Sequence, residues 1–397
     1  MFGFEPTAEQ KMLVEAVRRY AENDLRVAAH QADESGELPR ELIEKGWELG
    51  VLQASVPEAY GGFGERSAVT GALAAEELAW GDLSGALAIM APGAYALSVL
   101  LSGSEDQKSK LIPAVIEGDW QPYAAAFMEP DYDFYAGEMR TTAVASNGDY
   151  LITGQKARVA FGDRARTLLT FARVEGQIEA FAVPTDTVGL QVGEREALLG
   201  IQALPTFPVT YKNVRVPASA RLKGMDPFKI LSSFDAAIGA LSVGLSRAAY
   251  EYALDYAKDR EAFGSPIAQK QAIAFMLAEM ATEIDGARLM VWEAAWEIDQ
   301  SKDASRTAFL ARTNAAETAM MVTDRAVQIL GGHGYIREHP VERWMRNARG
   351  LSTFAGLAMV WGASHDQFRD PRKHRTNGEY DRIGGHRDDA APSALLR

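Results

Sequence analysis

The spacing of apolar residues changes twice along the chain, and this order limits what it can fold into. In the first third, apolar side chains recur at helical spacing, beginning with an amphipathic segment from Thr7 to about Ala32. From about Tyr123 to Val216 they alternate, as in strands that bury one face. Beyond Pro227 helical spacing returns in long segments. The sequence therefore predicts a mainly α fold with a small central β-barrel or β-sandwich domain.

The same pattern gives the domain boundaries. We expect an all-α domain at 1–122, a β-domain at 123–217, a helical bundle at 227–364 and a polar tail at 365–397. The long helices of the bundle are predicted from about Lys229 to Lys258, Pro266 to Gln300, and Ala304 to Leu330.

Turn residues mark two hairpins in the β-domain. Asn147-Gly148 separates two alternating segments, which predicts a type I′ turn. Glu175 to Gln177 separates the next pair of segments in the same way. Both pairs are therefore expected to be antiparallel.

Proline and serine mark the ends of the N-terminal helices. Pro39 is expected to open a helix that runs to Gly50, and Ser104 to cap one that runs to about Glu117. The stretch from Leu83 to Ser104 carries no charge, but Pro92-Gly93 interrupts it. We therefore predict two buried helices here, not one membrane span.

Composition excludes several classes of function. The 397 residues are 47% hydrophobic and 24% charged, a globular balance, and the net charge of −13 disfavours nucleic acid and anionic membranes as partners. There is no cysteine, which excludes disulfides and thiolate chemistry, and no motif with metal-ligand spacing occurs. The first residues lack the basic and apolar regions of a signal peptide, so a cytoplasmic protein is expected.

One stretch, from Tyr256 to Met280, combines a chain break with residues suited to a cofactor. Gly264-Ser265-Pro266 predicts that one helix ends and another begins, with Ser as N-cap and Pro as the first helical residue. Arg260, Phe263 and Gln271 flank this break. A bidentate guanidinium, an aromatic ring and an amide could hold a flat, phosphorylated cofactor. A surface arginine beside a core phenylalanine is the alternative.

Four motifs together resemble the acyl-CoA dehydrogenase family. They are Arg260-x-x-Phe263-Gly264 with the following Pro-Ile and Gln-Ala-Ile segments, Ala326 to Tyr335 followed by Glu338 to Arg343, Val56 to Gly62, and Gly200-Ile201 with Val214 to Pro217. They follow the order and spacing of that family over most of the chain. The resemblance implies an N-terminal helical domain, a central β-domain and a C-terminal four-helix bundle.

The resemblance also implies an FAD site built from two halves in different subunits. Typical members supply a glycine-rich loop and a Trp-Ile-Thr strand from one chain; the matching residues here are Phe127, Met128, Arg158 and Ala160. The second half, from the neighbouring subunit, corresponds to Arg260, Phe263, Gln271, Gln328, Gly331 and Gly332, all of which match the family. His333, beside these glycines, is interpreted as interface packing. The second half is thus preserved, while the first lacks the usual hydroxyls, indole and glycines.

The catalytic base of the family has no obvious counterpart. The usual glutamate positions are occupied by Ala355 and Phe234, neither of which accepts a proton. Asp235, beside Phe234, aligns with an arginine that helps to hold CoA in many relatives. It is either a substitute base or a charge that stabilises the start of its helix.

These observations leave three functions open. The chain is either the base-less subunit of a heteromeric FAD dehydrogenase, a self-sufficient flavoenzyme that uses Asp235, or a structural or regulatory homologue. The implied partners are an acyl-CoA or related thioester, a second subunit of the same family and electron-transferring flavoprotein. The implied assembly is a homo- or heterotetramer. The acyl chain is not specified.

Overall fold

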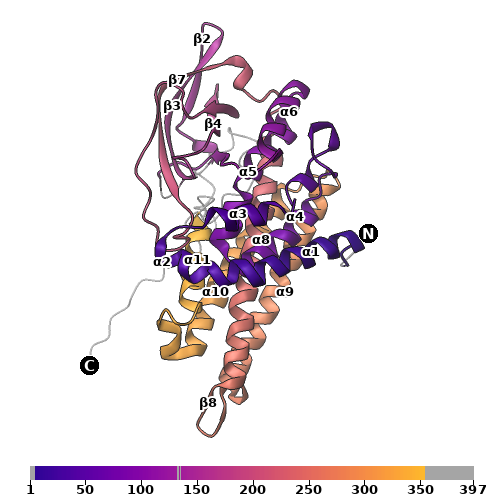
Figure 1. Cartoon of the computed structure of the whole chain (residues 1–397), viewed down its shortest axis with the longest axis vertical. Helices are drawn as coiled ribbons and strands as arrows, with labels where there is room; N and C mark the ends of the chain where they lie inside the picture. Colours follow the sequence, from indigo (N-terminus) through magenta and orange to yellow (C-terminus); the bar gives the residue numbers. More distant parts are fainter. Residues whose placement is uncertain (1–4, 132–133, 135, 354–397) are drawn as a thin grey trace, which may run out of the picture.

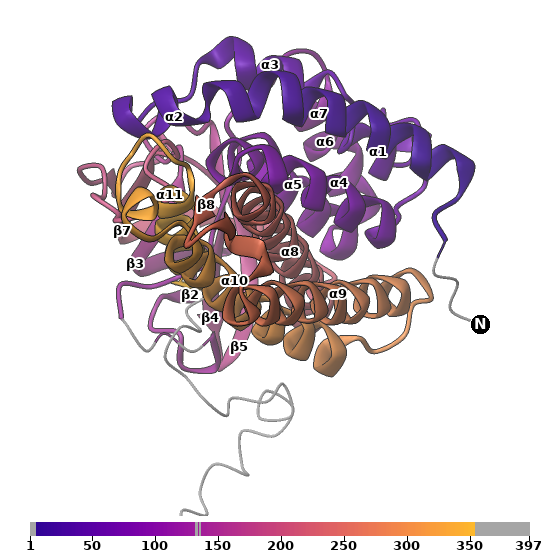
Figure 2. The same cartoon turned by 90° about the horizontal axis from the view of Figure 1, so that it is seen from below.

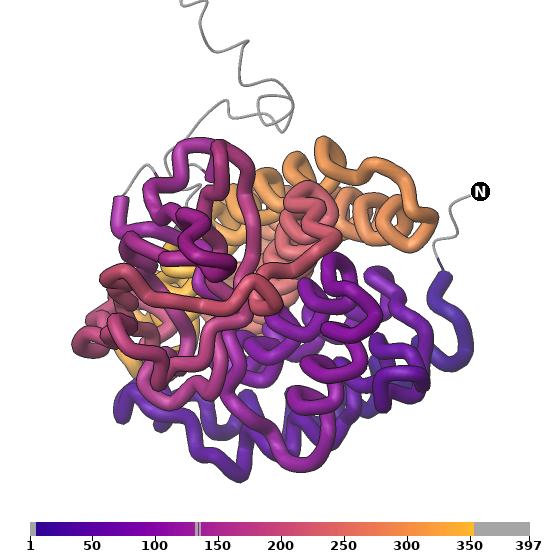
Figure 3. Tube along the Cα trace, turned by 90° about the horizontal axis from the view of Figure 1, so that it is seen from above, coloured from indigo at the N-terminus to yellow at the C-terminus, as the bar shows by residue number. Residues whose placement is uncertain are grey.

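A computed structural model describes residues 5–131, 134 and 136–353, and it confirms the predicted fold class (Figure 1). The strands of the central domain lie at one end of the molecule (Figure 1). The long helices α8 (Pro227–Asp259), α9 (Gln271–Asp299) and α10 (Ser305–Leu330) extend away from them to the hairpin of β8 (Glu261–Ala262) and β9 (Ser265–Pro266). Seen from above, the strands, the N-terminal helices, and α9 with α10 occupy three different sides (Figure 3). Ala355 and the polar tail lie outside the described residues.

The N-terminal part is helical, as predicted. Its elements are α1 (Ala8–Tyr20), a π-helical turn η1 (Ala21–Leu25), α2 (Arg26–Ser35), α3 (Arg40–Trp47), η2 (Gln53–Ser55), η3 (Glu58–Tyr60), α4 (Ala68–Gly81), α5 (Leu83–Ser102), α6 (Glu105–Leu111) and α7 (Pro113–Ile116). The predicted cap at Ser104 is confirmed, since its side chain accepts a hydrogen bond from the N–H of Gln107 in a capping box. Thr7 forms a second capping box, with Gln10.

The prediction of two helices around Pro92 is wrong, because α5 runs through it without a break. An internal proline removes one backbone hydrogen bond and costs roughly 3 kcal/mol. The helix is buried along much of its length, including Leu83, Ile89, Tyr95 and Val99, and this packing outweighs the cost. α5 and α8 are both long and apolar enough to span a membrane, but 61% of the relevant window of each is buried in the structure, as in core helices.

The central domain contains one seven-stranded sheet. Its strands are β1 (Ala124–Ala126), β2 (Thr142–Ser146), β3 (Asp149–Ala160), β4 (Thr167–Val174), β5 (Gln177–Pro184), β6 (Leu190–Val192) and β7 (Thr206–Pro217), with the short η4 (Ala136–Glu138) before β2 and η5 (Ala218–Ala220) after β7. They are ordered β1-β4-β2-β3-β7-β6, and β5 pairs with β4. Both predicted hairpins are confirmed. Asn147 and Gly148 have φ of 54° and 87°, and Glu175 and Gly176 have φ of 49° and 88°, as type I′ turns require.

The C-terminal part is a helical bundle, seen nearly end-on in Figure 2. It consists of α8 (Pro227–Asp259), the hairpin β8 (Glu261–Ala262) and β9 (Ser265–Pro266), η6 (Ile267–Gln269), α9 (Gln271–Asp299), α10 (Ser305–Leu330), η7 (Gly331–Tyr335) and α11 (Val341–Thr353). The prediction that Pro266 begins a helix is wrong. Phe263 and Gly264 both have positive φ, of 52° and 78°, and form a tight turn that pairs Ser265-Pro266 with Glu261-Ala262.

Gly200 connects the central domain to α11. A Cβ atom at this position would lie 2.0 Å from the carbonyl oxygen of Arg346, so only glycine allows the contact. The next residue, Ile201, donates its N–H to Oδ1 of Asn347 at 2.7 Å. The close approach explains this motif without any role in chemistry.

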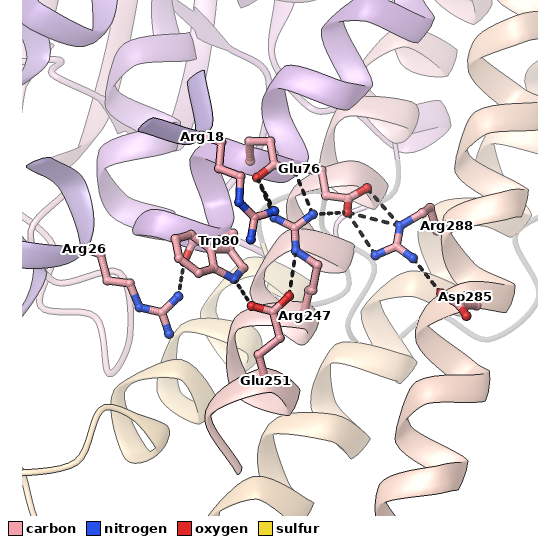
Figure 4. A network of polar contacts seen from close by, with 9 residues as sticks. Arg18, Arg26, Glu76, Trp80, Arg247, Glu251, Asp285 and Arg288 are labelled. Atoms are coloured by element: carbon pink, nitrogen blue, oxygen red, sulfur yellow. Dashed lines mark hydrogen bonds and ion pairs between the residues drawn. The ribbon is translucent and has the colours of Figure 1, made fainter. Parts of the chain in front are cut away.

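A buried ionic network joins the N-terminal helices to the bundle (Figure 4). The Arg247 guanidinium of α8 contacts Glu76 at 2.8 Å and Glu77 at 2.6 Å, both on α4. Arg288 of α9 contacts Glu76 at 3.1 Å. Arg18 of α1 contacts Glu77 from the surface at 3.4 Å. The two carboxylates are buried, so the network ties α4 to both bundle helices by charge as well as by packing.

Candidate functional site

A cavity of about 340 Å³ lies between the N-terminal helices, the central domain and the first half of α8. Its wall is formed on one side by α3, α4 and α5, on another by residues of the central domain, and on the third by α8; the central-domain residues are Ala124, Ala125, Phe127, Met128, Phe134, Ala136, Ala157, Arg158 and Ala160. Nearly all the lining side chains are apolar, including Trp47, Leu78, Met90, Leu97 and Phe309. Such a space suits a largely apolar ligand that must be kept from water.

The structure brings one group of predicted residues to this cavity. Phe127, Met128, Arg158 and Ala160 border it from the central domain, and Phe234 and Asp235 border it from α8. None of the preserved second group is among its lining residues. The cavity is therefore adjacent to the half-site that has diverged from the family pattern.

The backbone of Met128, a residue that lines this space, has an unused donor. Met128 is buried, and its carbonyl oxygen accepts a hydrogen bond from the N–H of Ala157 at 2.9 Å. Its own N–H has no acceptor within the described part of the chain. A buried N–H without a partner is rare, so it is available to a bound group with an acceptor atom at its edge.

A buried ion pair, missed by the sequence analysis, fixes the loop that carries Met128. Lys156 of β3 is fully buried, and its Nζ donates to the carbonyl oxygen of Phe127 at 3.0 Å and to Oε1 of Glu129 at 3.1 Å. Glu129 also accepts the N–H groups of Arg140 and Thr141. The two charges thus hold residues 127–129 against β3. The only sign of this ion pair in the sequence is that Lys156 falls on the buried side of an alternating strand. This sign is weak, because lysine side chains mostly face solvent.

We expect the stability contributed by Lys156 to depend on pH. Burial lowers the pKa of its ammonium group from 10.5 to about 8, against the opposing effect of Glu129. Because the folded pKa lies below the unfolded one, the cost of the buried charge is present below pH 8 and is relieved as the pH rises toward 10.5. The free energy of unfolding, relative to Lys156→Met, should therefore rise by up to about 1.4 kcal/mol per pH unit in this window. Urea unfolding of both proteins at pH 7 to 10 checks this, and parallel pH profiles would contradict it.

Asp235 lies in a buried ion pair. Its Oδ1 is 2.7 Å from Nε of Arg312 on α10, and the two side chains are 7% and 4% exposed. Burial lowers the pKa of the Arg312 guanidinium, and the charge of Asp235 opposes this shift. This contact gives Asp235 a structural role between α8 and α10 that competes with a role as base. The N-cap of α8 is Asp226, whose carboxylate accepts the N–H groups of Phe228 and Lys229, so Asp235 is not needed at the helix start.

The second group of predicted residues lies at the other end of the bundle. Arg260 follows the last residue of α8, and Asp235 is 25 residues earlier in the same helix, which separates them by about 37 Å at 1.5 Å per residue. Phe263, at the tip of the β8–β9 hairpin, is 97% exposed. Gln271 opens α9, Gln328 lies in the last turn of α10, and Gly331 and Gly332 begin η7; all are exposed.

His333 belongs to a pair of stacked imidazoles at this end. Its ring lies 5.3 Å from that of His339, centroid to centroid, with an interplanar angle of 14°. Nδ1 of His333 is 2.7 Å from the hydroxyl of Tyr256, and Nδ1 of His339 is 2.8 Å from that of Tyr252. The histidines therefore join the segment after α10 to α8. The role of His333 in packing at a subunit interface stays a prediction.

Among the described residues no group of three His, Asp or Glu side chains could hold a metal ion. Phe234, which occupies one of the usual positions of the family's base, borders the cavity with a phenyl ring and cannot accept a proton. The polar groups at the cavity are thus backbone donors, Arg158, the paired Asp235 and three serines, Ser55, Ser98 and Ser233.

Comparison with known proteins agrees with this architecture. The chain matches the N-terminal, middle and C-terminal domains of acyl-CoA dehydrogenase at residues 7–119, 124–214 and 231–360. It is 36% identical to the probable acyl-CoA dehydrogenase YngJ of Bacillus subtilis, over 90% of this chain and 97% of the relative. It is 32% identical to CarC, a subunit of the caffeyl-CoA reductase–Etf complex of Acetobacterium woodii, over 89% of this chain and 96% of CarC.

Solved structures agree as well. Butyryl-CoA dehydrogenase of Megasphaera elsdenii superimposes with a TM-score of 0.83 at 30% identity, covering 90% of this chain and 96% of that one. A glutaryl-CoA dehydrogenase of Mycobacterium smegmatis in complex with FADH2 has a TM-score of 0.83 at 26% identity, covering 92% of this chain and 96% of that one. The three domains, their order and these similarities show that the chain belongs to the acyl-CoA dehydrogenase family.

Proposed function

We propose that this chain is a subunit of an FAD-dependent oxidoreductase that introduces an α,β double bond into an acyl thioester. We further propose that it works in a heteromer, without a base of its own, and contributes Arg260 and Gln328 to the FAD site of a related partner subunit. The observation that carries this proposal is the distance along α8 between Arg260 and the cavity, about 28 Å from the last lining residue, Leu241, and about 37 Å from Asp235. No single copy of the chain can use both groups on one cofactor.

The residues at the cavity suit the flavin end of FAD. When bound, FAD supplies the acceptor for the two electrons and the hydrogen that leave the acyl chain. The unpaired N–H of Met128 can donate to an acceptor atom of the flavin ring, and the apolar wall excludes water. The ion pair of Lys156 and Glu129 keeps that N–H in place.

The exposed end of the bundle suits the phosphate end of a neighbour's FAD. The backbone of Arg260 is fixed on both sides, by a bond from its N–H to the carbonyl of Tyr256 and one from the N–H of Ile267 to its own carbonyl, each 2.8 Å. A guanidinium carried on a fixed backbone is suited to bidentate binding of a pyrophosphate. The ring of Phe263 is exposed in the single chain, and a neighbouring subunit would cover it.

A second candidate is a self-sufficient flavoenzyme made of identical chains. The retained cavity and the free N–H of Met128 favour it, because a chain that only supports its neighbour needs neither. Asp235 would then be the base, and it would have to leave Arg312, its partner at 2.7 Å. For either candidate we propose a cytoplasmic protein with electron-transferring flavoprotein as electron acceptor, because the relative CarC is a subunit of a caffeyl-CoA reductase–Etf complex.

Purification of the chain alone, followed by visible absorbance spectroscopy and light scattering, tests the two candidates. A colourless protein that binds FAD only with a related subunit supports the heteromer. About one FAD per chain and thioester oxidation by the homo-oligomer support the self-sufficient enzyme. A protein that never supports flavin binding or activity, alone or in complex, contradicts both and leaves a structural homologue. A monomer at micromolar concentration contradicts any site shared between chains.

We expect Ala355→Glu not to create dehydrogenase activity in the isolated chain. The substitution restores a carboxylate at the usual position, but the side chains of Met128, Arg158 and Ala160 still differ from the family pattern. Anaerobic mixing with a series of acyl-CoAs, followed by the loss of flavin absorbance, is the measurement. Rapid reduction by the variant alone would show that only the base was missing, and the heteromer proposal would then be wrong. Ala355→Gln, which has the same size but no charge, is the matched control.

A further inference from the structure

Arg158 lies in a distorted part of β3 at the wall of the cavity. The register of β3 on β7 shifts between Lys156 and Val159, which marks a bulge, and Arg158 itself has φ of 54°. Its N–H donates to Oε2 of Glu196 at 3.0 Å, and this bond holds the bulge. Bulges re-aim side chains near active sites, and non-glycine residues at positive φ persist only where the surroundings hold them. The local strain therefore fixes where the Arg158 side chain leaves the strand.

The side chain brings a cation to an otherwise apolar wall. Arg158 lines the cavity, and its Nε is buried without a hydrogen-bond partner among the described residues. Across the cavity, the carboxylate of Asp235 is already paired with Arg312. Glu196 bonds to Arg158, but the contact it makes is to the backbone N–H. The guanidinium thus has an unused donor at Nε, and no ion pair to it occurs among the described residues.

Resting on the assignment of FAD to this cavity, we propose that Arg158 is a cofactor-binding residue that binds reduced FAD more tightly than oxidised FAD. Reduction adds two electrons and one proton to the flavin ring, so the reduced ring carries one more negative charge. A partly buried cation stabilises the more negative form, because low local polarity strengthens the attraction. A tryptophan, which typical relatives have at this position, has no charge and cannot discriminate in this way.

The prediction is that loss of the charge changes the two affinities unequally. Arg158→Met keeps an unbranched, flexible side chain and a non-glycine backbone but removes the guanidinium and its charge. We expect the affinity for reduced FAD to fall about tenfold more than that for oxidised FAD, which corresponds to a decrease of about 30 mV in the midpoint potential of the bound two-electron couple. Arg158→Lys should recover most of the difference.

The experiment measures FAD binding by flavin fluorescence, first under air and then after reduction with dithionite. The full chain is used, together with its partner subunit if binding requires one. The potential is measured independently by equilibration with a reference dye. Arg164→Met is the matched control, because Arg164 lies on the same domain but is exposed and paired with Asp163. Circular dichroism confirms that each variant is folded.

The outcomes separate this inference from the proposed function. If the unmodified chain binds no FAD under any condition, the cofactor assignment and the inference both fail. If it binds FAD but Arg158→Met leaves the ratio of the two affinities within about twofold of the original, the inference alone fails. An equal fall in both affinities likewise overturns it, because Arg158 would then be a structural contact only. A selective loss for reduced FAD, recovered by Arg158→Lys, supports it.

Discussion

Arg247→Met is expected to lower the free energy of unfolding by about 3–5 kcal/mol, because it leaves two buried carboxylates without their shared partner. Glu76 and Glu77 are 6% and 7% exposed, and Arg247 contacts both at 2.8 and 2.6 Å (Figure 4). Arg288 still reaches Glu76 at 3.1 Å, but Glu77 then retains only the more distant Arg18, at 3.4 Å, among its ion pairs in the described residues. Urea unfolding at pH 7, at one fixed protein concentration, is the measurement.

Arg18→Met is the control for this prediction. Arg18 contacts the same carboxylate, Glu77, but its side chain is 43% exposed. Exposed ion pairs contribute about 0–1 kcal/mol, so the control should have little effect. Adding Glu77→Gln to Arg247→Met should recover part of the loss, because it removes the unpaired charge. Equal effects of the two arginine substitutions would show that burial does not decide the strength of this network.

The local features that the sequence predicted correctly are those set by neighbouring residues. The type I′ turn at Asn147-Gly148 requires positive φ at both residues, and both residue types favour it. The second hairpin was predicted from its spacing and from Gly176, although its turn also places Glu175 at positive φ. The cap at Ser104 depends on a residue only three positions away. The change from helical to alternating spacing reflects which faces are buried, and it gave the order of the domains.

The two local errors arise where distant packing outweighs local preference. Pro92 disfavours a continuous helix, but the buried faces of α5 hold it together. Ser265-Pro266 is a good helix start, but the turn at Phe263-Gly264 pairs these residues with Glu261-Ala262 instead. No pattern within a short window reports such contacts.

The contacts that define the site join residues far apart in sequence, so the sequence alone did not reveal them. Lys156 pairs with Glu129, and Asp235 pairs with Arg312 on another helix. The resemblance to a family brought Phe127, Met128, Arg158 and Ala160 to attention, and the structure places all four at one cavity. The resemblance did not indicate that the carboxylate of Asp235 is paired with Arg312, because Arg312 belongs to none of the matched motifs.

Arg260→Ala is expected to weaken FAD binding by the assembled protein about ten- to a hundredfold while leaving the chain folded. The side chain is exposed at the end of α8, so its removal opens no cavity in the core. A charge-assisted hydrogen bond contributes roughly 1.5–3 kcal/mol, which gives the expected loss. Arg260→Lys should recover only part of the affinity, because an ammonium group cannot bind a pyrophosphate through two parallel bonds. Phe263→Ala should weaken binding through lost packing.

The matched control is Lys258→Ala, which removes a neighbouring exposed cation that pairs with Asp255 at 3.4 Å. Equilibrium dialysis of FAD against the complex, and light scattering to confirm its assembly, are the measurements. If Lys258→Ala weakens binding as much as Arg260→Ala, the effect is one of general charge and not of a defined phosphate contact.

Subunit mixing then shows which chain each half-site serves. One variant carries Arg260→Ala with an intact cavity, and the other carries Ala160→Phe, which fills the cavity wall but leaves Arg260 in place. In a homo-oligomer each variant alone should bind FAD poorly, and a refolded mixture should regain tight sites, because one chain then supplies the cavity and the other the arginine. In a heteromer, Arg260→Ala in this chain should weaken the partner's FAD site, whereas Ala160→Phe should leave that site unchanged. If the mixture of the two variants regains no tight sites, and Arg260→Ala also leaves the partner's FAD site unchanged, Arg260 does not act across an interface and the proposed shared site is wrong.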